Sequence, residues 1–461
     1  MQRTAEQIEH DLLWPIFHTS RKYWIAVAIC TSLFLAGVAA FGYQLYAGIG
    51  VWGINSPVFW AFDITNFVFW IGISHAGTLI SAILRLCNAT WRRPVTRCAE
   101  AITVFAILIG GLVPLCHIGR PWLAFWMIPY PNQRGIWPNF RSPLAWDFFA
   151  ISTYLTGSSI FLYLPTIPDF ASVRDAATGL RKKIYRVLAL GWRGTPRQWQ
   201  RLEIAMHIMA IAIVPVAVSV HTIVSWDFSM TLVPMWHSSI FGPYFVVGAI
   251  FSGIAALMIA MALLRKLLRL EEYLKPIHFD NLGKLLLVMS LLWFYFTFCE
   301  RMTAWYGNTP SEMAVFWSGI RQSFAPLFWA MVVCNFIIPM PILAIKRFRT
   351  IKGTAIASFF IVIGMWLERF LIIVPALDHK FLSYSWGHYK PTWVEWTLMA
   401  AAFGFMALLY LLFTKFVPMI SIWEMKVGLL PEHGAAHATV IAEAERPGFA
   451  TTGPRPADVM E

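Results

Sequence analysis

IFGPYFVVGAIFSGIAALMIAMALLR, residues 240–265, carries no charged side chain before its last residue, Arg265. A helix crosses the hydrocarbon core of a bilayer with about 20 apolar residues. Nine further stretches meet the same condition. The sequence therefore predicts an all-α integral membrane protein with ten transmembrane helices over residues 23–47, 57–86, 95–116, 143–165, 202–226, 240–265, 283–305, 323–345, 353–375 and 392–417.

The composition excludes several classes of protein. Hydrophobic residues make up 58% of the chain and charged residues 13%, which is about half the charged share of a soluble domain. A surface this apolar cannot face water, so a soluble globular enzyme is excluded. The net charge of +12 is not carried by a folded soluble domain, so nucleic acid is not an expected partner.

The six cysteines form no C-x-x-C pair. That spacing is part of thioredoxin motifs, c-type haem sites and ferredoxin-type cluster motifs. We therefore expect this chain to bind no haem, iron–sulfur cluster or metal ion of its own.

Lysine and arginine are distributed unequally between the two sides of the predicted spans. Of the 36 basic residues, 28 fall on the side of the termini, seven on the other side, and Arg369 within a span. The positive-inside rule then predicts a multi-pass protein of the bacterial inner membrane with both termini in the cytoplasm. Because the segment 166–201 is basic, we expect it to lie against anionic lipid or a partner.

The spans divide the chain into four parts. Residues 1–22 form an amphipathic cytoplasmic lead-in, and residues 23–226 hold spans 1–5 with the first four-helix bundle (spans 2–5). Residues 227–426 hold spans 6–10 with the second bundle (spans 6–9), and residues 427–461 form a disordered cytoplasmic tail. The bundles are predicted to be a parallel repeat flanked by single helices. The periplasmic loop 117–142 is rich in Trp and Pro, so we expect it to fold back onto the protein.

Polar residues gather at the periplasmic ends of the first bundle. Ionisable residues in membrane spans are costly, and they are functional candidates for that reason. The alternative interpretation is that each residue caps a helix or sits at the interface. The candidates are Asp63 and Asn66 in span 2, His117 and Arg120 at the end of span 3, Trp146 and Asp147 in span 4, and His221 and Asp227 in span 5.

A second set of residues suggests a proton route. It comprises His75 and the adjacent pairs Glu300-Arg301 and Glu368-Arg369. Neighbours on a helix point about 100° apart, so we expect pairing between spans 7 and 9 rather than within each doublet. A structural ion pair is the alternative. A single haem between His75 and His207 is geometrically possible, although satisfied core histidines are the favoured interpretation.

The sequence resembles a known family. HIGRP (117–121), PYPNQRGIWPNFRSPLAWDFFAIS (129–152), the ten spans and WLERF (366–370) resemble the NrfD-like, or polysulfide reductase membrane subunit, family. The similarity is greatest to the ActC quinol-binding subunits of alternative complex III, and it extends to about residue 426.

The resemblance implies a quinol-binding subunit that oxidises menaquinol near the periplasmic face of the membrane. Whether the complex also translocates protons is left open by the sequence. The family's quinol-site His and Asp fall on His117 and Asp147. The implied partners are c-type multihaem cytochrome subunits, an iron–sulfur protein subunit, a paralogous NrfD-like membrane subunit and a terminal oxidase.

The chemistry of the residues agrees with this implication. Quinol oxidation releases two protons, and a His with a partly desolvated Asp can accept them. Three alternatives remain open: the membrane anchor of a polysulfide, nitrite or molybdopterin-type reductase, a secondary transporter, and a purely structural anchor.

The charge distribution makes a prediction about topology. Reporter fusions after residues 180 and 430 should report a cytoplasmic location, and a fusion after residue 130 should report a periplasmic location. Alkaline phosphatase and fluorescent-protein reporters measure this directly, and reversed activities would contradict the placement of the polar cluster.

Overall fold

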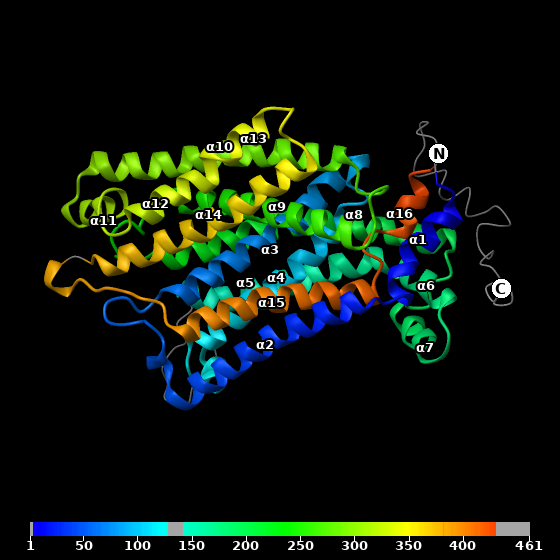
Figure 1. Ribbon diagram of the computed structural model, residues 1–461, viewed down its shortest axis with the longest axis horizontal. Coiled ribbons are helices and arrows are strands. Elements are labelled where there is room, and N and C mark those ends of the chain that lie inside the picture. Colours follow the sequence, from blue (N-terminus) through cyan, green and yellow to red (C-terminus); the bar gives the residue numbers. More distant parts are fainter. Residues whose placement is uncertain (1–2, 128–141, 381, 430–461) are drawn as a thin grey trace.

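The computed structural model of the chain describes residues 3–127, 142–380 and 382–429. Ten helical segments in these ranges are long and apolar enough to cross a membrane, and the described residues contain no strand. The spans lie side by side (Figure 1). They are α2 (Arg21–Ala47), α3 (Phe62–Leu86), α4 (Thr96–His117), α5 (Pro143–Tyr163) continued by η4 (Leu164–Thr166) and α6 (Ile167–Ala176), α8 (Pro196–Ser229), α9 (Phe241–Leu267), α10 (Pro276–Gly307), α12 (Ala325–Val332) to α13 (Pro339–Ala344), α14 (Ile351–Asp378) and α15 (Trp393–Phe416).

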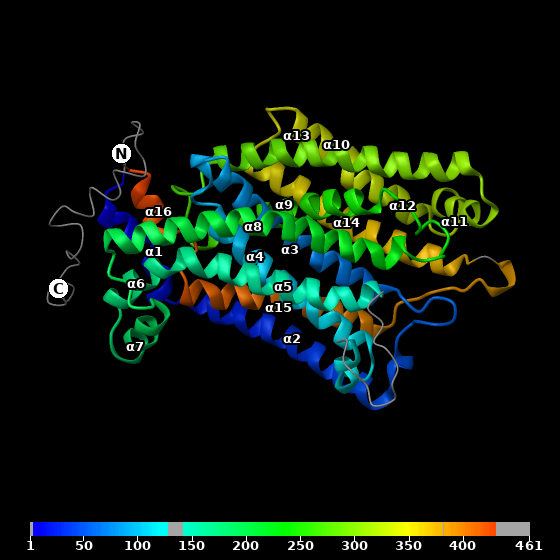
Figure 2. The same ribbon diagram turned by 180° about the vertical axis from the view of Figure 1, so that it is seen from behind.

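The two ends of the molecule differ. Short helices α1 (Ala5–Phe17), α7 (Gly179–Leu188) and α16 (Ile422–Val427) gather with α6 at the end where the chain begins, which we call the inner end (Figures 1 and 2). Helix α11 (Pro310–Ile320) lies at the opposite, outer end, which also carries η1 (Ile49–Val51), η3 (Pro121–Met127) and η6 (Ser383–Ser385). The remaining short turn, η2 (Thr90–Arg92), joins α3 to α4.

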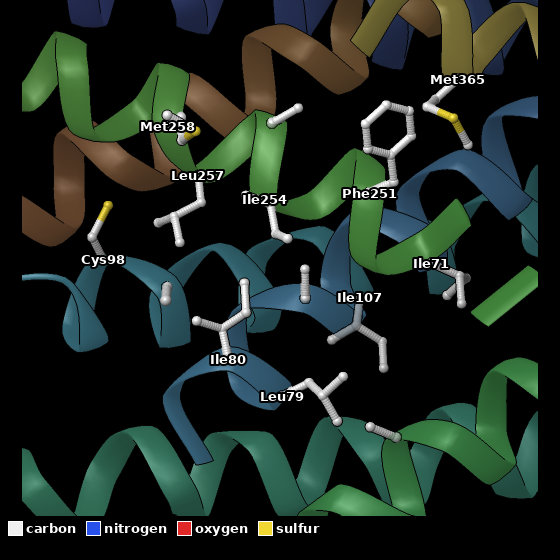
Figure 3. Packing of buried hydrophobic residues seen from close by; sticks show 14 of the residues in the cluster. Ile71, Leu79, Ile80, Cys98, Ile107, Phe251, Ile254, Leu257, Met258 and Met365 are labelled. Atoms are coloured by element: carbon white, nitrogen blue, oxygen red, sulfur yellow. The ribbon is translucent and has the colours of Figure 1, made fainter. Parts of the chain in front are cut away.

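Helix α3 is the central element of the first bundle. It packs against α4 and α8 within that bundle and against α9 of the second, so almost all of its length is buried. Its approach to α4 is close at Gly77, where an added Cβ would lie 1.9 Å from the carbonyl oxygen of Ala99. Figure 3 shows the apolar contacts around this crossing, including Leu79, Ile80 and Ile107.

The second bundle consists of α9, α10, α12 to α13, and α14. Helix α9 joins it to α3: an added Cβ on Gly253 would lie 2.2 Å from the Cβ of Ala76, so only glycine allows this separation. Between α12 and α13 the chain forms a π-helix, η5 (Val333–Ile337). Pro339 and Pro341 follow it, and neither can donate a backbone hydrogen bond.

Helices α2 and α15 pack along each other beside the first bundle, although they stand at opposite ends of the chain. Gly37 allows this contact, because a Cβ there would lie 2.2 Å from the Cβ of Ala401. Small residues permit close helix approach in the same way in many membrane proteins.

Ion pairs close the inner end of the first bundle. The buried carboxylate of Glu424 in α16 contacts Arg92 at 2.9 Å and Arg85 at 3.3 Å. Burial alone would raise the pKa of Glu424, but the charges of Arg92 and Arg85 outweigh it and hold that pKa below its ordinary value. The buried Asp169 also binds Arg97 and the backbone N–H groups of Ile422 and Trp423.

The predicted number and order of spans are confirmed, but several boundaries differ. The second span starts at Phe62 rather than residue 57, and spans five and seven start earlier, at Pro196 and Pro276. These two helices extend past the bilayer core, which hydropathy does not detect. In the predicted loop 117–142, residues 128–141 lie outside the described ranges, as do residues 430–461 of the predicted tail.

The closure of the inner end generates a prediction about stability. Glu424→Gln should lower the free energy of unfolding by roughly 3 kcal/mol, because it leaves two arginines facing a neutral amide. The measurement is thermal or denaturant unfolding of the purified protein in detergent. Glu272→Gln is the matched control, since its partner Arg3 is exposed and the stability should hardly change. Equal stability of both variants would contradict the assigned role of Glu424.

Candidate functional site

Four helices of the first bundle each bring one ionisable side chain to the outer end. Asp63 lies in the first turn of α3 and His117 is the last residue of α4. Asp147 follows the helix-starting Pro143 of α5 by one turn, and Asp227 lies in the last turn of α8. All three acids are buried. The structure therefore gathers at one end of one bundle residues that are up to 164 positions apart.

Asp63 and His117 form the first pair. Oδ2 of Asp63 contacts Nδ1 of His117, whose side chain is 24% exposed. A carboxylate on one imidazole nitrogen fixes the ring's orientation and tautomer, and it stabilises the ring when it takes a proton. The second ring nitrogen, Nε2, is then the one able to accept a proton from a bound molecule.

Asp147 and Asp227 form the second pair. Their side chains are in hydrogen-bonding contact, and neither Oδ1 atom has a hydrogen-bond partner within the described parts of the chain. A hydrogen bond between two carboxyl groups requires a proton, since two adjacent carboxylates repel each other. This arrangement suits a group that takes up and releases protons. Trp146 lies beside it, with its ring 5.9 Å from that of Trp226.

A cavity of about 340 Å³ opens next to the first pair. Its walls come from α2, α3, α4 and α15, and they are almost entirely apolar. Val38 of α2 is 50% exposed and Leu112 of α4 is 43% exposed, so the mouth of the cavity faces the lipid between these helices. A lipid-soluble molecule can therefore enter from the bilayer.

Polar atoms gather at the outer end of this cavity. Asp63 and Asn66 line it from α3, and Oδ1 of Asn66 accepts a hydrogen bond from Nε1 of Trp366 at 2.8 Å. Glu395 lines it from α15 and accepts bonds from the Tyr389 hydroxyl at 2.5 Å and the Gly53 N–H at 2.9 Å. Burial, together with Glu395, raises the pKa of Tyr389, so this hydroxyl stays protonated and donates. Sequence reasoning did not identify Glu395.

A cluster of rings lies deeper in the first bundle. The His75 ring stacks on Tyr154 and also lies beside His221, with centroids 4.6 Å apart in both cases. Both ring nitrogens of His221 and Nε2 of His75 lack hydrogen-bond partners within the described residues. The structure does not place His75 and His207 to hold a haem between them, because His207 is exposed on α8 and the His75 ring lies beside His221 instead.

Toward the inner end the polar side chains continue. Tyr154 donates to the Ser74 carbonyl at 3.2 Å, and the buried hydroxyl groups of Thr78 and Thr103 are nearby. The Ser81 hydroxyl donates to the buried Glu100 at 2.5 Å. Sequence reasoning missed Tyr154 and Glu100, although an acid within the predicted span 95–116 was an available signal.

The second bundle holds the other predicted residues. Glu368 forms an ion pair with its neighbour Arg369 at 2.7 Å and accepts a bond from Nε1 of Trp293 at 2.5 Å. The predicted pairing between spans 7 and 9 was therefore wrong for this doublet. The long Arg369 side chain bends back to Glu368, while its guanidinium covers the Phe245 ring at 4.9 Å.

Glu300 and Arg301 have different surroundings. Glu300 accepts a bond from Ser238 at 2.7 Å, and Arg301 stacks on Phe328 at 5.3 Å. Both line a small cavity of about 30 Å³ with Tyr244, which has room for a single water molecule. In the first bundle, Arg120 is exposed just beyond His117.

Fold and site together define a multi-pass helical membrane protein with two pairs of ionisable side chains at one end and an apolar cavity beside the first pair. Within the described ranges, no group of three or more His, Cys, Asp or Glu residues is placed to hold a metal ion. Residues 50–378 match the family described as polysulphide reductase, NrfD, and the chain belongs to this family.

Three curated relatives are similar to this chain. The C subunit of selenate reductase from Mesobacillus selenatarsenatis is 24% identical over 84% of this chain and 92% of its own length. The Hdr-like menaquinol oxidoreductase integral membrane subunit of Archaeoglobus fulgidus is 23% identical over 85% and 92%. A Halobacterium salinarum protein, named as the membrane C subunit of a dimethyl sulfoxide reductase, is 26% identical over 54% of this chain, and the match spans about half (52%) of that relative.

Proposed function

We propose that this chain is the quinol-oxidising membrane subunit of a respiratory oxidoreductase complex of the alternative complex III type. The observation that carries the proposal is the lipid-facing cavity that ends at Asp63, which is itself bonded to His117. A quinol has an apolar body and two hydroxyl groups, so it fits a cavity of this composition. The name of the Archaeoglobus fulgidus relative, a menaquinol oxidoreductase subunit, supports menaquinol as the substrate.

The two pairs would divide the proton chemistry. Quinol oxidation yields a quinone, two protons and two electrons. His117 accepts a proton at Nε2 while Asp63 stabilises the imidazolium ring, as carboxylates do for catalytic histidines. Asp147, with Asp227, accepts the second proton at an oxygen that has no partner in the described chain. Asn66 and Trp146 help to position the ring, and the exposed Arg120 contacts the partner or the substrate.

The electrons leave the chain to a partner. We propose an iron–sulfur protein subunit at the periplasmic side, followed by c-type multihaem cytochromes and a terminal oxidase, with a paralogous NrfD-like subunit beside this chain. The absence of C-x-x-C spacing from the sequence supports an acceptor outside this chain. We also propose that the chain lies in the bacterial inner membrane with both termini in the cytoplasm, as the distribution of its basic residues indicates.

A second candidate keeps the same quinol reaction but changes the partner. Two of the relatives are named as subunits of selenate and dimethyl sulfoxide reductases, which favours a reductase membrane anchor. The composition of the purified complex distinguishes the two candidates: multihaem cytochromes support the first, and a molybdopterin subunit supports the second.

The buried polar side chains would carry protons across the membrane. In the first bundle the route runs from Asp147 and Asp227 past His221, His75 and Tyr154 to Ser81 and Glu100. In the second bundle Glu300 and Arg301 line the small cavity, and the ion pair of Glu368 with Arg369 would continue this shorter series. Such chains of titratable groups are typical of proton relays in membranes.

The first test concerns Asp147. Asp147→Asn keeps the shape and one acceptor oxygen but cannot take a proton, so quinol oxidation should fall by about two orders of magnitude or more. The measurement is quinol-dependent reduction of the partner haems at equal complex content. Asp175→Asn is the control, because Asp175 is an exposed acid at the inner end and should leave the rate unchanged. An unaltered rate in Asp147→Asn would show that the chemistry lies elsewhere.

The second test concerns the proton route. Glu100→Gln keeps the hydrogen bond to Ser81 but interrupts proton transfer. We expect fewer protons translocated per electron in proteoliposomes, while uncoupled quinol oxidation stays near the wild-type rate. An unchanged proton-to-electron ratio would rule out Glu100 as a route member.

A further inference from the structure

About half of the residues that line the cavity lie outside the part of the chain that matches the family. Helices α2 and α15 both lie beyond residues 50–378, yet each contributes a row of apolar side chains to the cavity. The α2 row is Phe34, Gly37, Val38 and Phe41, and the α15 row is Leu398, Ala401, Ala402 and Phe405.

The two rows have the same spacing. Each follows the pattern i, i+3, i+4, i+7, which places four residues on one face of a helix. Contact at Gly37 and Ala401 holds the helices together, and the rings of Phe34 and Phe405 stack at 4.6 Å at the deeper end. The part of the cavity that these two rows line, which we call the slot, extends from Phe34 to Phe41 for roughly 10 Å along α2.

Polarity changes along this slot. Its outer end meets Asp63 and Glu395, whereas its deeper part is lined by Phe34, Phe405 and small apolar residues. A phospholipid phosphate would be repelled by the two acids at the outer end, because like charges disfavour each other at short range. A neutral head with hydroxyl donors is the complementary occupant, and an apolar chain fits the rest.

We infer that α2 and α15 form a clamp for the polyprenyl tail of the quinol, so that these two helices select long-chain membrane quinols over short-chain soluble ones. This inference rests on the proposed quinol oxidation. The tail leaves the slot through the mouth between Val38 and Leu112, and the head lies against Asp63 and His117. The chemistry of the head and the recognition of the tail are thus carried by different parts of the chain.

The test narrows the mouth without disturbing the core. Val38→Trp adds a large side chain at a half-exposed position, and Leu35→Trp is the matched control, since Leu35 is 56% exposed on the same helix but does not line the cavity. The intact complex is assayed with a polyprenyl menaquinol in nanodiscs and with a short-chain naphthoquinol. Phe41→Ala, which enlarges the slot, is the second variant.

We expect Val38→Trp to raise KM for the polyprenyl quinol about tenfold, because the new side chain would displace about two CH₂ groups of the tail from the cavity. KM for the short-chain quinol should change little. Phe41→Ala should likewise weaken only the long-chain substrate, and Leu35→Trp should match the wild type. Equal effects on both quinols, or none, would overturn the tail clamp. The tail clamp would also be overturned if phospholipid, rather than quinone, co-purified with the wild-type complex and was lost in Val38→Trp. A wild-type complex inactive with both quinols would instead refute the proposed function.

Discussion

The cost of placing an ionisable group in hydrocarbon governs the whole structure. A charged side chain that lacks a partner is strongly disfavoured there, so each buried acid must find a donor or share a proton. The central helix α3 meets this condition at both ends: Asp63 contacts His117 at its start, and Ser81 contacts Glu100 near its end. These contacts, together with the close crossing at Gly77, determine how α3 and α4 are rotated against each other.

The kind of partner differs between the two ends of the first bundle. At the inner end, Glu424 and Asp169 are bound by arginines, which keep their charge at every physiological pH. At the outer end, the acids contact a histidine or another acid, and both kinds of partner can exchange protons. The inner end is thus built as a fixed closure, and the outer end has the chemistry that proton transfer requires.

Helices α2 and α15 add one wall of the cavity to the region that matches the family. Asp63 and Asn66 line the same cavity from α3, opposite the residues that these helices contribute. Their contact also brings Glu395 of α15 to the same cavity, where Tyr389 and the Gly53 N–H satisfy its carboxylate. A pair of helices that are far apart in the sequence therefore completes the cavity beside Asp63.

The sequence by itself determined the number of spans and the family, and it located most of the ionisable residues at the outer end. Hydropathy and charge are local properties of the chain, so they can be read without a fold. Only the tertiary structure decided that His117 contacts Asp63, that Asp147 contacts Asp227, and that Arg369 bends back to Glu368. Those contacts depend on the order and rotation of helices around a bundle. An apolar span has little periodicity that would indicate which face turns inward, and the cavity formed by α2 and α15 was hidden for the same reason.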